Sequence, residues 1–155
     1  LLEFGKLIEK TGIPKGVINI ITKNALVLRD IDILSEMAKQ RLVNVHISLT
    51  TLNESLRLAM EPRTVTGKQR LKVIEKLTAA GIPVGVMTAP IIPALNSYEI
   101  PKLIEEAANH GALGAGYTIV RLNGSIGPIF TDWVHKNFPD RANKVLKLIK
   151  QNYLN

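Results

Sequence analysis

A strict alternation of apolar and polar residues between positions 43 and 50 constrains the fold of this chain more than any other feature. One face carries Val43, Val45, Ile47 and Leu49, and the other face carries Asn44, His46, Ser48 and Thr50. Alternation with a period of two predicts a β-strand. Strands of an ordinary parallel sheet are covered on both faces and read as continuous apolar runs. A polar face on a strand between helices therefore indicates a wet cavity, as at the mouth of a barrel.

Segments with helical and strand patterns alternate along the whole chain. The strand pattern occurs at 17–22, 43–49, 84–88 and 115–121. The helical pattern occurs at 1–11, 30–41, 53–60, 68–80, 97–111, 126–137 and 140–152. Capping residues support these boundaries, with Asp30 and Thr66 at two helix starts and Gly81 at a helix end.

This alternation predicts an α/β fold in which parallel strands alternate with helices. A complete eight-fold (β/α) barrel needs roughly 250 residues, and the chain has 155. We therefore expect a partial TIM-type barrel with two extra helices at its C-terminal end. Residues 1–155 are predicted to form a single domain.

The composition excludes several kinds of site. The chain has no cysteine, so it contains neither a disulfide nor a thiolate ligand for a metal. Its three histidines, at positions 46, 110 and 135, show no metal-ligand spacing. No unbroken apolar run approaches the about 18 residues of a membrane span. We expect a cytoplasmic protein with no membrane partner and no metal site of its own.

A formal charge of +7 admits nucleic acid as a partner. The dense basic run consists of Arg141, Lys144, Lys147 and Lys150. These residues recur every three positions and alternate with apolar residues, which is typical of the solvated side of an amphipathic helix. The charge by itself is therefore weak support for nucleic-acid binding.

Polar side chains follow the predicted strands at the ends where βα folds keep their binding sites. Lys23 follows the first strand, Ser48 and Thr50 end the second, and Arg121 ends the fourth. No Gly-rich phosphate loop and no nucleophile motif is present. From the residues alone we predict a site for a small anionic or zwitterionic ligand, and the chemistry stays open.

Arg63 is a further candidate. Pro62 stops the preceding helix, so Arg63 is expected on a short, constrained loop that suits a bidentate carboxylate contact. A surface pair between Glu61 and Arg63, or contacts from Arg63 to helix-end carbonyls, is an equally weighted alternative. His46, on the polar face of its strand, is interpreted as a hydrogen-bonded barrel histidine or as a proton-transfer group.

Four sequence blocks occur in a recognisable order along the chain. They are Ile21-Thr22-Lys23-x-Ala25-Leu26-Val27-x-Arg29-Asp30-x-Asp32-x-Leu34, Ser48-Leu49-Thr50-Thr51-Leu52, Glu61-Pro62-Arg63 and Pro90-Ile91-Ile92-Pro93-x-Leu95-Asn96, and the pattern runs on through Phe138-Pro139-Asp140-Arg141-Ala142. Together they resemble the radical S-adenosylmethionine superfamily, and within it the spore-photoproduct-lyase-related branch. The resemblance implies a six-stranded partial barrel in which a Cys-x-x-x-Cys-x-x-Cys loop after the first strand holds a [4Fe–4S] cluster. That cluster reduces S-adenosylmethionine, and the radical so formed abstracts hydrogen from a substrate.

The absence of cysteine departs from this pattern. By the resemblance, the four strands are the third to the sixth of the barrel, and the cluster loop belongs to an upstream half that this chain needs as its partner. The chain is thus expected to be the C-terminal part of an enzyme and to be inactive alone. Lys23 and Ser48 are expected to contact the methionyl carboxylate or ribose of S-adenosylmethionine, with Thr50 and Arg63 as further candidates.

Two other functions remain open. One is a non-radical α/β-barrel enzyme that holds a phosphorylated ligand through Lys23 and Arg121, although no Gly-rich loop supports it. The other is a basic nucleic-acid-binding module. Aromatic residues, which stack on bases, make up only 5% of the chain and disfavour this module.

Overall fold

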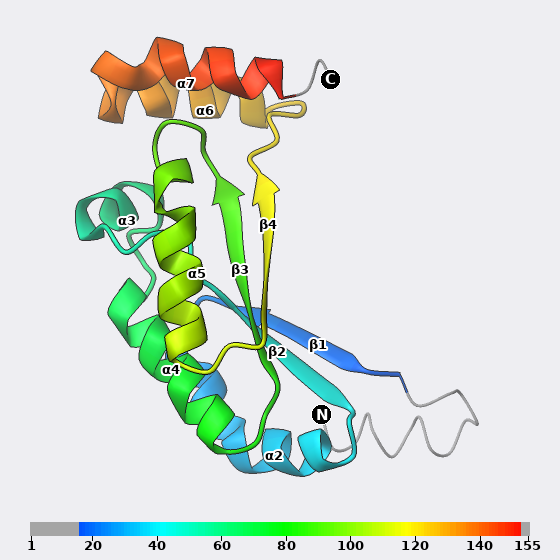
Figure 1. Cartoon of the computed structure of the whole chain (residues 1–155). Coiled ribbons are helices and arrows are strands. Elements are labelled where there is room, and N and C mark those ends of the chain that lie inside the picture. Colours follow the sequence, from blue (N-terminus) through cyan, green and yellow to red (C-terminus); the bar gives the residue numbers. More distant parts are fainter. Residues whose placement is uncertain (1–15, 153–155) are drawn as a thin grey trace.

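The computed structural model describes residues 16–152, and these form one parallel four-stranded sheet in the order β1-β2-β3-β4. The strands are β1 (Ile18–Thr22), β2 (Val43–Ser48), β3 (Val84–Ile91) and β4 (Gly114–Ile119). The sheet is strongly twisted, so that β1 and β2 cross β3 and β4 at an angle in Figure 1. The α/β fold with alternating strands and helices is confirmed, and it is consistent with a partial TIM-type barrel.

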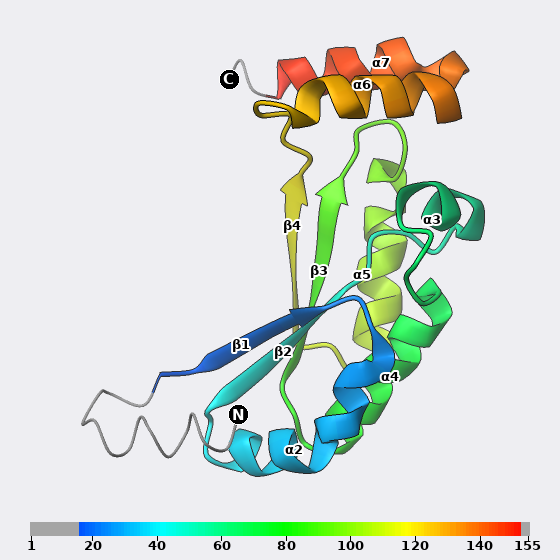
Figure 2. The ribbon, with the colours of Figure 1, turned by 180° about the vertical axis from the view of Figure 1, so that it is seen from behind.

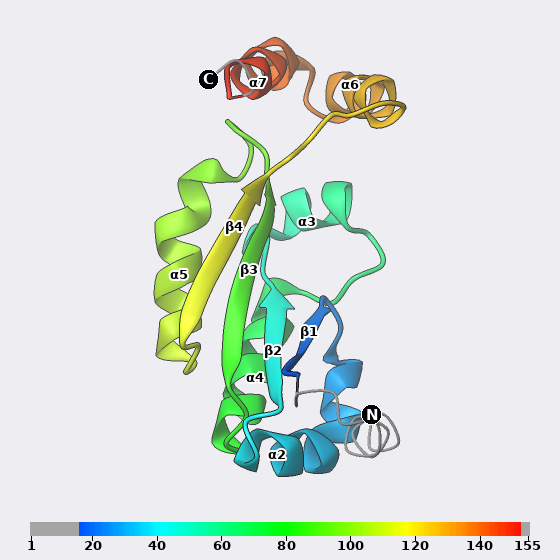
Figure 3. The same ribbon diagram turned by 90° about the vertical axis from the view of Figure 1, so that its right-hand side faces the viewer.

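Six α-helices and two 3₁₀ helices connect or follow the strands within the described residues. They are η1 (Ala25–Asp30), α2 (Ile31–Lys39), α3 (Glu54–Met60), α4 (Gly67–Ala79), η2 (Ser97–Glu99), α5 (Ile100–Asn109), α6 (Ile126–Asn137) and α7 (Pro139–Gln151). Helices α2, α4 and α5 lie on one side of the sheet, and α6 and α7 lie beyond the ends of β3 and β4 (Figures 1 and 3). None of these helices is long and apolar enough to span a membrane.

The alternation in β2 sorts its side chains between two different surroundings. Val43, Val45 and Ile47 are buried in the main core, which also contains side chains from α2, α4, β3 and α5. Asn44 and His46 point to the opposite face and are half-buried. Seen from behind, this opposite face of the sheet is not covered by a helix of the described residues (Figure 2). Asn44 and His46 of the predicted polar face thus lie on the open face of the sheet, whereas Ser48 and Thr50 are buried.

A second apolar cluster joins α6 and α7 to the loops at the carboxyl ends of the strands. Its buried residues include Leu56, Leu95 and Val134. Trp133 contacts Phe130 and Phe138, each with ring centroids 5.5 Å apart, and its Nε1 donates a 3.2 Å hydrogen bond to the Ala59 carbonyl. These aromatic residues thus pack together at α6 and the start of α7, and Trp133 connects them to α3.

The structure corrects several predicted boundaries. Strand β3 continues to Ile91, three residues beyond its predicted end. Its pairing with β4 shifts between Thr88 and Ile91, where Pro90 has no N–H to donate. The predicted helix 30–41 begins earlier as η1, which Asn24 caps by accepting a 3.0 Å hydrogen bond from the Leu26 amide. Asp30 makes no such cap. The predicted helix at 1–11 lies outside the described residues.

Candidate functional site

A buried carboxylate lies at the centre of a charged cluster at the carboxyl ends of β1 and β2. Glu61 Oε1 is 2.6 Å from Lys23 Nζ, and Glu61 Oε2 accepts a 2.6 Å hydrogen bond from Arg70 Nη2. The side chains of Glu61 and Arg70 are 7% and 2% exposed, whereas that of Lys23 is 38% exposed. One carboxylate between two cations leaves a formal charge of +1, and Lys23 is the member of the cluster that presents this charge to solvent.

Arg70 connects this cluster to the end of β2. Its Nη1 donates a 2.8 Å hydrogen bond to the Ser48 carbonyl, and its Nη2 also donates to Thr64 Oγ1 at 2.6 Å. Its Nε donates to the Val65 carbonyl at 3.2 Å. A buried charge is tolerated when it is paired and hydrogen-bonded, and all three guanidinium nitrogens of Arg70 have partners.

A second arginine holds the loop that carries Glu61. Arg57 Nη1 donates to the Thr64 carbonyl at 2.6 Å and to the Glu61 carbonyl at 3.2 Å. Its other two nitrogens donate to the two carboxylate oxygens of Glu54. The loop from position 61 to 65 is thus tied by Arg57 on one side and by Arg70 on the other.

The helices on both sides of this loop are also capped. Asn53 Oδ1 accepts from the Leu56 amide at 3.0 Å at the start of α3, and Thr66 forms a reciprocal capping box with Gln69 at the start of α4. The Thr66 cap fixes where the loop ends, and the loop begins where the Glu61 amide donates to the Arg57 carbonyl at the end of α3.

The pKa of the Glu61 carboxyl reflects two opposing effects. Burial raises this pKa, whereas the contacts with Lys23 and Arg70 lower it by more, so that it lies below its ordinary value. Glu61 is therefore ionised at neutral pH, as the ion pairs require.

Lys23 and Ser48 occupy adjacent positions on neighbouring strands. Thr22 of β1 pairs with Ile47 of β2 in the register of the sheet. Lys23 and Ser48 are the next residues along these two strands, so they lie side by side. Ser48 is 5% exposed. The structure thus brings these two predicted residues together and connects both of them to the Glu61–Arg70 pair. A shared contact with a ligand stays a prediction.

The structure places Thr50 in a closed environment. Its side chain is 1% exposed, and its hydroxyl has no hydrogen-bond partner within residues 16–152. Its carbonyl accepts a 3.0 Å hydrogen bond from Asn96 Nδ2. Asn96 also donates to the Pro90 carbonyl at 3.1 Å and accepts from the Ile92 amide at 2.6 Å. The proline-rich loop, residues 90–96, is thereby fixed against the end of β2.

Arg63 lies apart from the cluster. It is exposed, and within residues 16–152 it makes no ion pair. The alternative of a surface pair between Glu61 and Arg63 is wrong, because the Glu61 carboxylate is used by Lys23 and Arg70. Proximity in sequence is misleading here, since the side chain of Glu61 is buried and that of Arg63 is not.

Arg121 is also far from Lys23. The two residues follow β4 and β1, which lie at opposite edges of the sheet. Three strand spacings amount to roughly 14 Å, so a single phosphate bridging both residues is disfavoured. Arg121 is exposed.

The open face of the sheet carries a shallow cavity of about 440 Å³ between β2, β3 and β4. Its lining includes Asn44 and His46 of β2, Gly85 of β3 and Gly116 of β4. A Cβ atom at Gly85 would lie 2.7 Å from His46 Nδ1, so glycine is needed there for the imidazole to lie across β3. His46 belongs to this face and not to the charged cluster.

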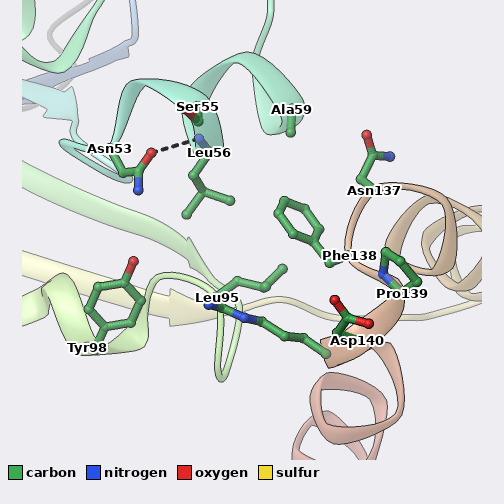
Figure 4. A pocket seen from close by; sticks show the side chains of 11 residues that line it. Asn53, Ser55, Leu56, Ala59, Leu95, Tyr98, Asn137, Phe138, Pro139 and Asp140 are labelled. Carbon is green, nitrogen blue, oxygen red and sulfur yellow. Dashed lines mark hydrogen bonds between the residues drawn. The ribbon is translucent and has the colours of Figure 1, made fainter.

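A cavity of about 430 Å³ lies between α3, the loop before α5 and the start of α7 (Figure 4). Leu56, Leu95 and Phe138 give it an apolar base. Asn53 faces it but is committed to capping α3, as the dashed line in Figure 4 shows. The cavity is lined by none of the residues of the charged cluster.

A family model described as the radical SAM superfamily matches residues 2–107. The chain belongs to this superfamily. The match includes Lys23, Ser48, Glu61 and Arg70, so the whole charged cluster of this radical SAM chain lies within the matched region. No group of three or more His, Cys, Asp or Glu side chains in the described residues is placed to hold a metal ion.

Curated relatives include the uncharacterised protein Rv2578c of Mycobacterium tuberculosis and the uncharacterised protein ORF301 of Acidianus two-tailed virus. The first is 30% identical over 136 residues, which is 86% of this chain and 40% of the relative. The second is 42% identical over 89 residues, which is 57% of this chain and 29% of the relative. This radical SAM chain thus spans about two fifths of the length of the mycobacterial relative. No solved structure matches it.

Sequence reasoning missed Glu61 and Arg70 as the centre of the cluster. A signal for Arg70 was present, because it lies on the buried stripe of α4 together with Leu71, Ile74 and Leu77. A cation on an apolar stripe must be buried with a partner, or the helix must turn it to solvent. No comparable signal identifies Glu61 as that partner.

Proposed function

We propose that this chain is the part of a radical SAM enzyme that binds the methionyl carboxylate of S-adenosylmethionine through Lys23. The observation that carries the proposal is the unbalanced positive charge of the Lys23–Glu61–Arg70 cluster, which is accessible at Lys23 on the strand ends. Binding sites of βα folds lie at these ends. The match to the superfamily supplies the cofactor class.

The donors at this site suit a carboxylate. The contact between Lys23 and Glu61 is an ion pair, and its geometry is not that of a hydrogen bond. The Lys23 ammonium has three N–H groups that can donate hydrogen bonds. Donors therefore remain for a second carboxylate. We propose Ser48 as the neighbouring contact to the carboxylate or ribose, and Arg63 as a contact that reaches the ligand from the exposed loop. In the conformation described, the Thr50 hydroxyl is closed off from a ligand, which weakens its candidacy.

The iron–sulfur cluster does not fit the residues of this chain, because a cluster of this family needs cysteine thiolates and the chain has none. We propose that the thiolate ligands come from the rest of the parent protein, in which these strands are the third to the sixth of the barrel. Bound S-adenosylmethionine would supply the radical that abstracts hydrogen from the substrate. The four sequence blocks support the spore-photoproduct-lyase-related branch. The cytoplasmic location stays a prediction.

The proposal is tested by replacing Lys23 with alanine in the parent protein reconstituted with its cluster. A hydrogen bond to a charged group contributes about 1.5–3 kcal/mol, which corresponds to roughly a 10- to 150-fold weaker affinity. Calorimetric titration with S-adenosylmethionine measures this loss, and Ser48→Ala is expected to show a loss in the same direction. Lys102→Ala, on the exposed side of α5, is the control and should bind as the unmodified protein does. Unchanged affinity in the Lys23 variant would refute the assignment.

A second experiment tests the basic helix. Replacing Arg141, Lys144, Lys147 and Lys150 together by glutamine should leave the affinity for S-adenosylmethionine unchanged, because all four side chains are exposed on α7. Their predicted exposure is confirmed. Binding of a duplex oligonucleotide, measured at several salt concentrations, should be equally weak before and after the change. A large loss, accompanied by a flatter salt dependence, would instead show that α7 is a nucleic-acid surface.

A further inference from the structure

We propose that Glu61 is a positioning residue that holds the Lys23 ammonium where it can recognise a carboxylate, and that Arg70 keeps this arrangement selective for an anion. The inference rests on the proposed function and extends it from the contact residue to the buried pair behind it. Neither Glu61 nor Arg70 needs to touch the ligand.

Glu61 restricts the motion of the Lys23 side chain. A lysine side chain is a flexible four-carbon stem with a compact charge at its end, so Lys23 alone would sample many positions. Glu61 is buried, and its loop is fixed by Arg57 and by Arg70. The 2.6 Å contact between Glu61 and Lys23 therefore ties a mobile cation to a rigid point at the strand ends.

Arg70 restores the positive charge that Glu61 would otherwise cancel at Lys23. Glu61 by itself would neutralise Lys23 and cancel its attraction for another carboxylate. Arg70 supplies a second positive charge 2.6 Å from the other oxygen of Glu61, and it is buried beyond the reach of solvent. The cluster thus keeps a formal charge of +1 with its accessible cation held in place. This combination selects a ligand with one carboxylate over the same ligand without it.

Arg70 also holds the backbone of Ser48 in place. Arg70 Nη1 donates to the Ser48 carbonyl, so the residue that compensates the charge of Glu61 also fixes the end of β2. Lys23 and Ser48 are then set relative to each other through two buried side chains. A direct contact between Lys23 and Ser48 is not needed for this arrangement.

The test compares two ligands in the parent protein reconstituted with its cluster: S-adenosylmethionine and its decarboxylated form, which keeps the sulfonium, the amine and the nucleoside. The ratio of their affinities reports recognition of the carboxylate. In Glu61→Asp, which keeps the +1 charge of the cluster and withdraws the carboxylate from Lys23 by one methylene, this ratio should fall about tenfold, the usual effect of losing one charged contact, while the affinity for the decarboxylated ligand stays constant. In the Lys23→Met background, Glu61→Asp should have no further effect on the ratio.

Glu54→Gln is the matched control, because Glu54 supports the same loop through Arg57 without contact to Lys23. Its ratio should equal that of the unmodified protein. If Glu61→Asp fails to fold, Glu61→Gln takes its place: this variant raises the charge of the cluster to +2, so a fall of the ratio would come from the lost position of Lys23 alone.

The outcomes separate the two proposals. Equal losses for both ligands in the Glu61 variants would show a purely structural role and overturn this inference. A ratio that stays at the unmodified value in those variants would overturn it as well. If Lys23→Met itself leaves the ratio unchanged, the proposed function fails at Lys23, whatever the Glu61 variants show.

Discussion

Replacing Arg70 with methionine should lower the free energy of unfolding by about 3–5 kcal/mol, the usual result of removing one partner from a buried ion pair. Arg70 is 2% exposed, and its loss leaves the Glu61 carboxylate with Lys23 as its remaining ion-pair partner within residues 16–152. The carbonyls of Ser48 and Val65 lose their hydrogen bonds from this side chain at the same time. Urea unfolding followed by circular dichroism measures the change.

The control for this prediction is an exposed ion pair. Lys102 on α5 pairs with Glu105 and Glu106 at 3.0 and 2.8 Å, and its side chain is 59% exposed. Lys102→Met should leave the unfolding curve unchanged, because water screens such pairs. If Arg70→Met were as mild as this control, the Glu61 environment would have to be solvated, and the positioning role of Glu61 would lose its basis.

Replacing Asn96 with alanine should cost about 3 kcal/mol or more, because two buried backbone groups and one half-buried group then each lose a partner worth about 1–3 kcal/mol. These groups are the Ile92 amide and the carbonyls of Thr50 and Pro90. Asn96 is fully buried, so water cannot replace its amide without rearrangement. Thermal and urea unfolding would both report the loss.

Asn137→Ala is the matched control for Asn96. Asn137 is exposed, and its Nδ2 donates one hydrogen bond to the Trp133 carbonyl within α6. Its replacement should change stability by about 0.5 kcal/mol or less, as is usual for surface positions. Similar effects at both positions would mean that the proline-rich loop is not fixed by Asn96 in solution.

Local patterns in the sequence were sufficient for much of the fold. The alternation at 43–48 identifies the strand and also its buried face, because successive side chains of a strand point to opposite sides whatever surrounds them. Asn53 and Thr66 cap the helices that were predicted to follow them, since a cap is made within three residues of the chain. The position of Lys23 and Ser48 at strand ends likewise follows from βα topology.

Where the sequence pattern failed, a local rule was overridden by a neighbour or by a backbone detail. Asp30 has the right chemistry for a cap, but its carboxylate pairs with Arg29, and Asn24 starts the helical turn earlier. Strand β3 runs through Pro90 because a shift in its pairing accommodates the missing N–H. Neither outcome can be read from residue types alone.

The sequence by itself determined the fold class, the strands, most helix boundaries and the end of the sheet at which charged groups gather, because each depends on interactions over a few residues or on chain topology. Only the tertiary structure decided the partners of those groups. Glu61 binds Lys23, which is 38 positions away, and turns from its near neighbour Arg63. Asn96 reaches Thr50 across 46 positions. Such pairs form because burial leaves a charge or an amide no water to bind, and packing alone determines which distant group is within reach.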